Sequence, residues 1–313
     1  MNEENNAPLW ALAYFRQIYS GRVETTEAGV EVVQLTEEEL CAEHLHLAYS
    51  ADGRHWTALN GNSPTFMRAD GGIIRDSFVQ RGPDGWFHLV GTGGPSPRSC
   101  FYARSENLMD WQDERQIPLM ENHPEVCNVW ATEWIYDAVQ GNYFVFWSSS
   151  NGSEGWDDSR IWACRTADFQ TFTAPFVLFD PGYTVIDATL IQKGDQWIMI
   201  FKDERFGHQH GEHRFLKVAT AAHLEGPYRV VTENITESIT EGPAVLEVEP
   251  ECWLLLYDWC MANDYGASES RDLIHWRPLP KGEIAFPPNA RHGSVFRITP
   301  AELTALKARF AAE

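Results

Sequence analysis

The run IIRDSFV at residues 73–79 places an acidic side chain, Asp76, at the head of a short apolar stretch. Three later runs repeat this arrangement, with Asp187, Glu241 and His292 at their heads: VIDATLI at 185–191, ITEGPAVL at 239–246 and RHGSVFRI at 291–298. The successive heads are 111, 54 and 51 residues apart, so one further unit is expected between the first two. The run WATEWIY at 130–136, around Ala131, fills that place.

A second apolar run follows each head about ten residues later, as in GWFHLVG at 85–91 and QWIMIFK at 196–202. Each pair indicates a strand, a turn and a second strand. Between the pairs lies another repeated unit, an alternating strand with a polar turn and a closing aromatic residue, whose five copies close at Trp56, Trp111, Phe172, Tyr228 and Trp276. Because a period of roughly fifty residues built from short strands is typical of propellers, the sequence predicts an all-β, five-bladed β-propeller.

The phase of the repeat predicts how the ring closes. The first outer hairpin, ending at Trp56, precedes every inner strand, and no outer hairpin follows the last inner strand at 291–298. Pairing the N- and C-terminal strands in one blade would remove two exposed sheet edges. A short C-terminal helix is expected over 299–310, with Thr299 as N-cap and Glu302 completing a capping box. No linker interrupts the chain, so residues 1–313 are expected to form a single catalytic domain.

The composition of the chain excludes some classes of binding partner and some locations. The 24 basic and 45 acidic residues give a net charge of −21, which disfavours nucleic acid. No apolar run is long enough to cross a membrane, and the start MNEENNAPLWALAYF lacks the features of a secretory signal, so a cytoplasmic location is expected unless a leader was removed. Six cysteines without a CxxC pair fit reduced thiols. The 13 Trp residues fit blade packing, or the stacking of sugars.

The heads of the inner strands should converge at one mouth of the central channel. Asp76, Asp187 and Glu241 would then share a pocket, and repulsion between the carboxylates would raise at least one pKa and separate acid from base roles. Two carboxyls of unequal pKa on opposite sides of a sugar are what glycoside hydrolysis requires. The alternative for each residue is a structural role, capping backbone N–H groups or solvating the rim.

The residues at the strand heads match the motifs of a known family. The chain is similar to glycoside hydrolase family 43 and its relatives, five-bladed propeller arabinofuranosidases and xylosidases, over nearly its whole length. The resemblance implies that Asp76 is the general base, Asp187 the residue that tunes pKa, and Glu241 of the Glu-Gly-Pro motif the general acid. It also implies that His292 helps to organise a central metal or water site, with calcium as the possible cofactor. The sequence departs from the family where Ser77 and Ala188 replace the usual prolines.

The resemblance further implies inversion of configuration, with the carboxyls of Asp76 and Glu241 about 6.5 to 9.5 Å apart. Glu241 should be protonated near neutral pH, its pKa raised by Asp187. The expected substrates are oligosaccharides or glycosides that contain a pentose, an α-L-arabinofuranoside or β-D-xyloside. The alternatives are a propeller that binds carbohydrate or a partner without cleavage, and an enzyme of the same clan that acts on fructosides or galactosides.

Four further residues are candidates for substrate binding. Glu133 should share a strand face with Ala131, and Trp130 is either a sugar platform or a core residue. Arg291 precedes a funnel residue and either binds sugar hydroxyls or forms a structural ion pair. His208 lies in the His-rich segment FGHQHGEHRF at 206–215, for which a loop that faces the substrate is favoured over a zinc site. The sequence leaves the oligomeric state open.

Overall fold

A computed structural model describes residues 8–18, 23–25, 31–33, 37–94, 98–151, 158–207, 210–260, 262 and 264–311. Strands dominate it, as predicted. They are β1 Leu9–Arg16, β2 Val23–Thr25, β3 Glu31–Val33, β4 His46–Ser50, β5 Thr57–Ala58, β6 Arg75–Arg81, β7 Phe87–Thr92, β8 Cys100–Ser105, β9 Trp111–Ile117, β10 Trp130–Asp137, β11 Asn142–Ser150, β12 Ser159–Thr166, β13 Phe176–Phe179, β14 Val185–Lys193, β15 Gln196–Asp203, β16 Phe215–Ala221, β17 Arg229–Val230, β18 Thr240–Glu249, β19 Cys252–Trp259, β20 Asp264–Ser270, β21 Arg277–Pro278 and β22 Ala290–Ile298. The helices are α1 Glu37–Ala42 and α2 Pro300–Phe310, with 3-10 turns at Asn60–Asn62 and Lys281–Glu283.

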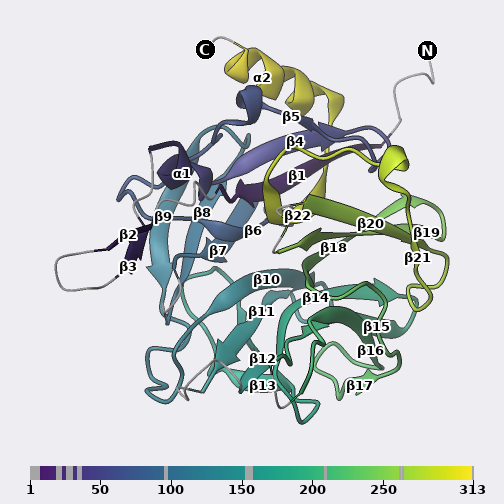
Figure 1. The fold of residues 1–313 in the computed structure, drawn as a ribbon. Helices are drawn as coiled ribbons and strands as arrows, with labels where there is room; N and C mark the ends of the chain where they lie inside the picture. The colour runs from purple at the N-terminus through teal and green to yellow at the C-terminus, as the bar shows by residue number, and fades with distance from the viewer. Residues whose placement is uncertain are drawn as a thin grey trace.

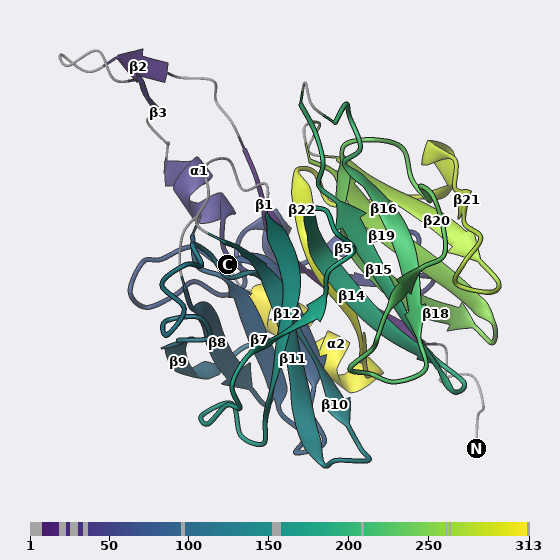
Figure 2. The same ribbon diagram turned by 90° about the horizontal axis from the view of Figure 1, so that it is seen from below.

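The strands form groups of four. Three are separate sheets, β10 to β13, β14 to β17 and β18 to β21. An eight-stranded sheet, in the order β5-β4-β1-β22-β6-β7-β8-β9, consists of two antiparallel groups that meet at one parallel bridge, between Gly293 and Ser77. In Figure 1 the strands β6, β10, β14, β18 and β22 lie nearest the middle of the molecule. The small β2–β3 hairpin stands away from these groups (Figure 2).

The two ends of the chain pair with each other. β1 runs antiparallel to β22, from Leu9 opposite Ile298 to Arg16 opposite Ala290. This is the pairing that the phase of the repeat predicted. The C-terminal helix is also confirmed: Thr299 accepts a hydrogen bond from the N–H of Glu302, whose side chain accepts one from the N–H of Thr299.

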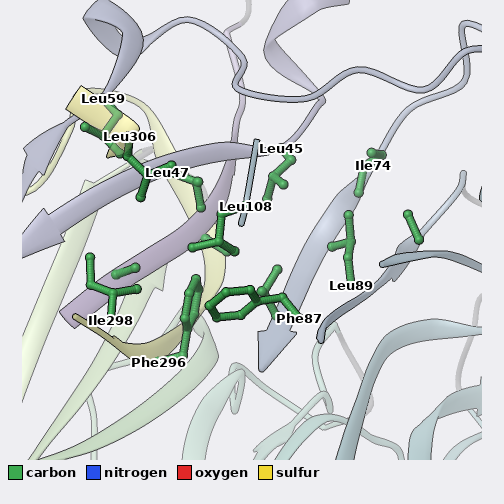
Figure 3. Packing of buried hydrophobic residues seen from close by; sticks show 14 of the residues in the cluster. Leu45, Leu47, Leu59, Ile74, Phe87, Leu89, Leu108, Phe296, Ile298 and Leu306 are labelled. Carbon is green, nitrogen blue, oxygen red and sulfur yellow. The ribbon is translucent and has the colours of Figure 1, made fainter. Parts of the chain in front are cut away.

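The hydrophobic core is divided into clusters that lie between neighbouring strand groups. In the first, β1, β4 and β22 pack against β6 to β8, where the rings of Phe87 and Phe296 meet edge to face at 5.7 Å (Figure 3). Leu303 and Leu306 of α2 belong to the same cluster. Burying such side chains contributes about 1.5–3 kcal/mol each, so α2 is fixed to the first and last strands of the chain.

Four further clusters continue this arrangement. They join β6 to β9 with β10 to β13, then β14 to β17, then β18 to β21, and finally β18 to β20 with β1, β4 and β22. Every strand group is therefore packed on both faces against a neighbour. All six cysteines are free. Within the described part of the chain, no helix has the length and apolar character needed to cross a membrane.

Candidate active site

The inner strand of each group, which is β6, β10, β14, β18 or β22, carries a β-bulge near its start. The residue just before each bulge pairs with the second strand: Arg75 with Thr92, Trp130 with Ser148, Ile186 with Lys202, Glu241 with Asp258, and Arg291 with Phe15. The two residues that follow have no partner on the second strand, as is usual in a bulge. Asp76, Ala131 and Asp187 begin these unpaired segments with φ of 50°, 46° and 52°, values uncommon outside glycine. The bulges therefore re-aim the side chains at the strand heads.

Glu241 does not occupy the position that Asp76 and Asp187 share. In β18 the left-handed position belongs to Gly242, with φ of 62°, and Glu241 is one residue earlier. A Cβ atom at Gly242 would lie 2.8 Å from Cγ of His292, so no side chain fits there. The sequence pattern had aligned the three acids, and the structure shows instead that Glu241 enters the site from the position before the bulge.

The strand heads surround one cavity of about 230 Å³, here called the central cavity. Six of the predicted site residues line it: Asp76, Trp130, Asp187, Glu241, Arg291 and His292. The remaining lining residues are Phe15, Gln17, Arg75, Thr92, Gly94, Ile186 and Glu204. Among the predicted site residues within the described ranges, only Glu133 is absent from this lining. His208 lies outside the described residues.

Asp76 and Asp187 are linked through His292. One oxygen of Asp76 accepts a hydrogen bond from the Thr92 hydroxyl at 2.6 Å, and the other lies 3.3 Å from Nδ1 of His292. The same ring nitrogen is 3.7 Å from an oxygen of Asp187. Burial disfavours the imidazolium, but these two carboxylates, together with those of Asp258 and Glu241, outweigh burial and raise the pKa of His292. His292 therefore lies between the two acids as a shared positive partner.

Asp187 is a carboxyl of the central cavity that retains its proton up to near neutral pH. Asp187 is only 6% exposed, and burial raises the pKa of its carboxyl to about 7. Repulsion from Glu241 adds to this rise, while His292 opposes it. The backbone N–H of Asp187 donates to the Ser148 hydroxyl at 3.0 Å, which fixes the bulged turn.

Glu241 is bound by two cations. Nζ of Lys202 donates to one of its oxygens at 2.7 Å, and the guanidinium of Arg291 donates to the other. Burial alone would raise the pKa of Glu241, but Lys202 and Arg291 hold it below its usual range. The sequence analysis expected Glu241 to be the protonated acid near neutral pH. In the structure the pKa values are ordered the other way, since Asp187 holds its proton while Glu241 is ionised. The reason is Lys202, a cation that the sequence reasoning had not placed in the site.

Arg291 combines the two roles considered for it. Its guanidinium donates to Glu241, to Asp258 and to the side chain of Gln17, and it lies over the ring of Phe15 at 5.7 Å. It lines the central cavity and is also a buried structural ion-pair partner.

The second strands supply the supports that sequence reasoning missed. Thr92, Ser148, Lys202 and Asp258 are all buried and occupy equivalent positions in β7, β11, β15 and β19. Each bonds to the head of the next inner strand: Thr92 to the N–H of Ala131, Ser148 to Asp187, Lys202 to Glu241, and Asp258 to the N–H of His292. The signal was present, because each of these polar residues ends an otherwise apolar run.

Glu133 lies beside the central cavity, not in its wall. It is 8% exposed, and burial raises its pKa to about 8, although a hydrogen bond with Thr189 opposes the rise. A neutral carboxylic acid there is consistent with a packing role behind the site.

The residues around His292 do not match the ligand set of a calcium site. Calcium takes six to eight oxygen ligands, about 2.3–2.6 Å away. His292 instead places a ring nitrogen between two carboxylates, and no three His, Cys, Asp or Glu side chains in the described ranges form a group that could hold a metal ion. The described residues therefore do not fit calcium, and no step proposed below uses a metal; the cofactor stays a prediction from the resemblance.

Comparison with known proteins identifies relatives and structures that share the fold. An α-L-arabinofuranosidase from Bifidobacterium longum subsp. longum is 27% identical over 183 residues, which are 48% of this chain and 17% of that protein. The chain thus spans less than a fifth of that relative. An α-L-arabinofuranosidase from Lactobacillus brevis superposes with a TM-score of 0.51 at 15% identity, covering 66% of this chain and 72% of the other. A GH43_1 enzyme from Xanthomonas citri complexed with xylose gives 0.53 at 13% identity, covering 66% and 73%. Both of these solved structures share their fold with this chain.

The family match is broader. Residues 28–304 match the family described as "Probable glycosyl hydrolase domain", which is related to glycoside hydrolase family 43. This segment is most of the chain, and it contains every residue named above in the central cavity except Phe15 and Gln17. The protein therefore belongs to this family related to glycoside hydrolase family 43.

Proposed function

We propose that this protein is an inverting glycoside hydrolase that releases a pentose, from an α-L-arabinofuranoside or a β-D-xyloside. The observation that carries the proposal is that Asp76, Asp187 and Glu241, far apart in sequence, line one cavity. We further infer a five-bladed β-propeller. The groups of four antiparallel strands and the core clusters between successive groups, including the last and the first, support this architecture.

In the proposed reaction Asp76 is the general base. Thr92 and His292 hold its carboxylate at the cavity wall, where it can accept a proton from a water molecule. The water oxygen bonds to the anomeric carbon as the glycosidic C–O bond breaks, and the leaving oxygen takes a proton from Glu241. Atoms and charge balance, since one proton enters Asp76 and one leaves Glu241. The carboxyl separation of about 6.5 to 9.5 Å that inversion requires stays a prediction.

Glu241 can act as the acid only after it gains a proton. Lys202 and Arg291 stabilise its ionised form, so the substrate must weaken at least one of these contacts. Arg291 is the partner in the cavity wall, where sugar hydroxyls can compete for its guanidinium. Asp187 is the adjacent carboxyl that carries a proton near neutral pH, and we propose that it modulates Glu241 as the resemblance implies.

The size and lining of the cavity support a small sugar. Its volume of about 230 Å³ is below the roughly 300–1,000 Å³ typical of ligand pockets, which favours a single ring. Trp130 and Phe15 offer aromatic surface, while Gln17 and Arg291 offer polar atoms. The Bifidobacterium relative and the Lactobacillus neighbour are both arabinofuranosidases by name, which favours the arabinofuranoside.

The test is a panel of nitrophenyl pentosides, hexosides and fructosides, followed by NMR of the first-formed anomer. We expect turnover of a pentoside with inversion, and loss of at least about 10³-fold in kcat for Asp76→Asn and, on unactivated glycosides, for Glu241→Gln. Glu133→Gln is the matched control, a buried carboxyl that does not line the cavity. Retention of configuration, or unchanged turnover in Asp76→Asn, would contradict the assigned roles; preference for a galactoside or fructoside would contradict the pentose.

A further inference from the structure

A second cavity lies at the opposite ends of the strands from the central cavity. It has a volume of about 470 Å³ and is formed by the β10–β11 turn, the β14–β15 hairpin and the segment after β16. Strand β10 begins with Trp130 in the central cavity and reaches this second one at Tyr136, six residues later. At about 3.3 Å per residue, the two cavities are separated by roughly 20 Å along the strand. We call this second one the basal cavity.

The side chains of the basal cavity suit a sugar. Trp197 and Tyr136 are both partly exposed and line it, so each offers aromatic surface to the apolar face of a pyranose or furanose ring. Gln140 and Gln192 add amides, which both donate and accept hydrogen bonds, as sugar hydroxyls do. The amide nitrogen of Gln192 also donates to the Gly194 carbonyl at 3.2 Å, which orients that side chain in its hairpin.

The charges of the cavity select a neutral ligand. Arg165 is the one Lys or Arg among the described lining residues. Its guanidinium already donates to Glu225 at 2.7 Å, to Asp137 at 3.0 Å and to Asn142 at 2.7 Å. An anionic sugar would therefore meet two carboxylates and an engaged guanidinium, on a chain with a net charge of −21. A uronate polymer or a phosphorylated ligand would be repelled.

A neighbouring cavity extends the surface. It has a volume of about 330 Å³, shares Tyr136 with the basal cavity, and is also lined by Tyr143 and Gln170. The two hollows therefore meet at one aromatic side chain on the β10–β11 side of the molecule. A ligand that fills both must be longer than one sugar ring.

We propose that the basal cavity and this neighbour form a second carbohydrate-binding site, which takes a chain of several neutral sugar units and holds the enzyme on a polysaccharide. The site uses no residue of the central cavity, so it would operate whether or not the catalytic roles proposed above are correct. It would raise the local concentration of chain ends at the central cavity when the substrate is a polymer.

The experiment is affinity gel electrophoresis of the full chain with neutral arabinoxylan, and with polygalacturonate, in the gel. An Asp76→Asn background prevents degradation of the polymer. Trp197→Ala is expected to weaken retention by arabinoxylan about tenfold, whereas Trp276→Ala, a partly exposed tryptophan of the β20–β21 hairpin, should leave it unchanged. Polygalacturonate should retain neither the parent protein nor the variants. In the catalytically intact background, Trp197→Ala should keep its kcat/KM on a nitrophenyl glycoside.

Trp197 also packs against the core, so Trp197→Ala could lose binding because it folds poorly. A second variant, away from the core, separates these two causes. The double substitution Gln140→Ala and Gln192→Ala changes exposed or partly exposed polar residues and should also reduce retention. Absence of retention of the parent protein by arabinoxylan, equal retention of parent and variants, or equal retention by polygalacturonate would overturn the proposal. Turnover by Asp76→Asn would instead contradict the catalytic assignment and leave the binding result readable.

Discussion

Replacement of Lys202 by Met should destabilise the protein and alter the acid of the site. Lys202 is 2% exposed, and its Nζ lies 2.7 Å from Glu241 and 2.7 Å from Glu204. Methionine preserves much of the apolar packing but leaves both carboxylates without this partner. Breaking a buried ion pair by removing one partner typically costs about 3–5 kcal/mol, because the other charge stays buried.

The expected shift in melting temperature follows from the length of the chain. With an unfolding entropy of about 2.1 cal/mol/K per residue, 313 residues give about 0.66 kcal/mol/K, so the melting temperature should fall by about 5–8 °C. Differential scanning calorimetry at pH 7 measures this shift. Since Lys202 lowers the pKa of Glu241, its removal should raise that pKa and move the basic limb of the kcat profile to higher pH.

Glu204→Gln provides the control. This substitution leaves the contact between Lys202 and Glu241 in place. The basic limb of the kcat profile should therefore not move in Glu204→Gln, and should move to higher pH only in Lys202→Met. The double variant should recover part of the stability lost in Lys202→Met, because one of the two stranded carboxylates is then neutral. A melting temperature within about 1 °C of the parent protein for Lys202→Met would refute the ion-pair argument.

Three further predictions concern the surroundings of the site. Gly242→Ala should lower stability by about 1–3 kcal/mol in urea unfolding and reduce kcat, since φ is 62° and the new Cβ would press on His292; Gly194→Ala, with φ of 58° and open space, should lose stability without losing kcat. The pKa of His46 is lowered by burial from 6.5 to about 3, so its stabilising effect is present above pH 6.5 and lost on acidification, by about 2 kcal/mol at pH 5; His46→Gln should flatten this loss. Burial raises the pKa of Glu133 from 4.5 to about 8, so its contribution is full below pH 4.5 and falls by about 2 kcal/mol by pH 6; Glu133→Gln should remove that fall in the unfolding free energy.

The sequence predicted the scaffold more fully than the site. The apolar runs are long enough to show strand pairs, and their spacing shows the repeat, so the all-β class, the pairing of β1 with β22 and the helix α2 could all be predicted. The five-blade count and its closure remain inferences that the strand groups and core clusters support. The acids of the site could also be selected, because a charged residue at the head of a buried strand needs a reason.

The position of Glu241 could not be predicted from the same pattern. Whether a head residue lies before or within a bulge depends on backbone dihedral angles that are not visible in the sequence pattern, and at the left-handed position of β18 only glycine fits beside His292. Lys202 was missed for a related reason. A single polar residue at the end of an apolar run resembles a strand terminus, and the ion pair of Lys202 with Glu241 joins residues 39 positions apart, which no local pattern reveals.

In the proposed reaction, the charges of the site account for how Glu241 can gain a proton despite the two cations bound to it. Apart from the ion pair of Arg75 with Glu43, five carboxyls gather around the central cavity, against three groups that can be positive: Asp76, Asp187, Glu204, Glu241 and Asp258 against Lys202, Arg291 and His292. Even with all three cations charged, full ionisation would leave two uncompensated negative charges in a buried place, and this favours the uptake of protons. Burial raises the pKa of Asp187 while Lys202 and Arg291 keep Glu241 ionised, so the retained proton is expected on Asp187, although His292 and Lys202 oppose it there. In the proposed reaction, a substrate that draws Arg291 away from Glu241 would shift this balance, and a proton could then pass to Glu241 as the general acid. Under the proposed mechanism the second strands would set the role of each acid, because Thr92, Ser148, Lys202 and Asp258 give successive inner strands of a repeating scaffold different partners.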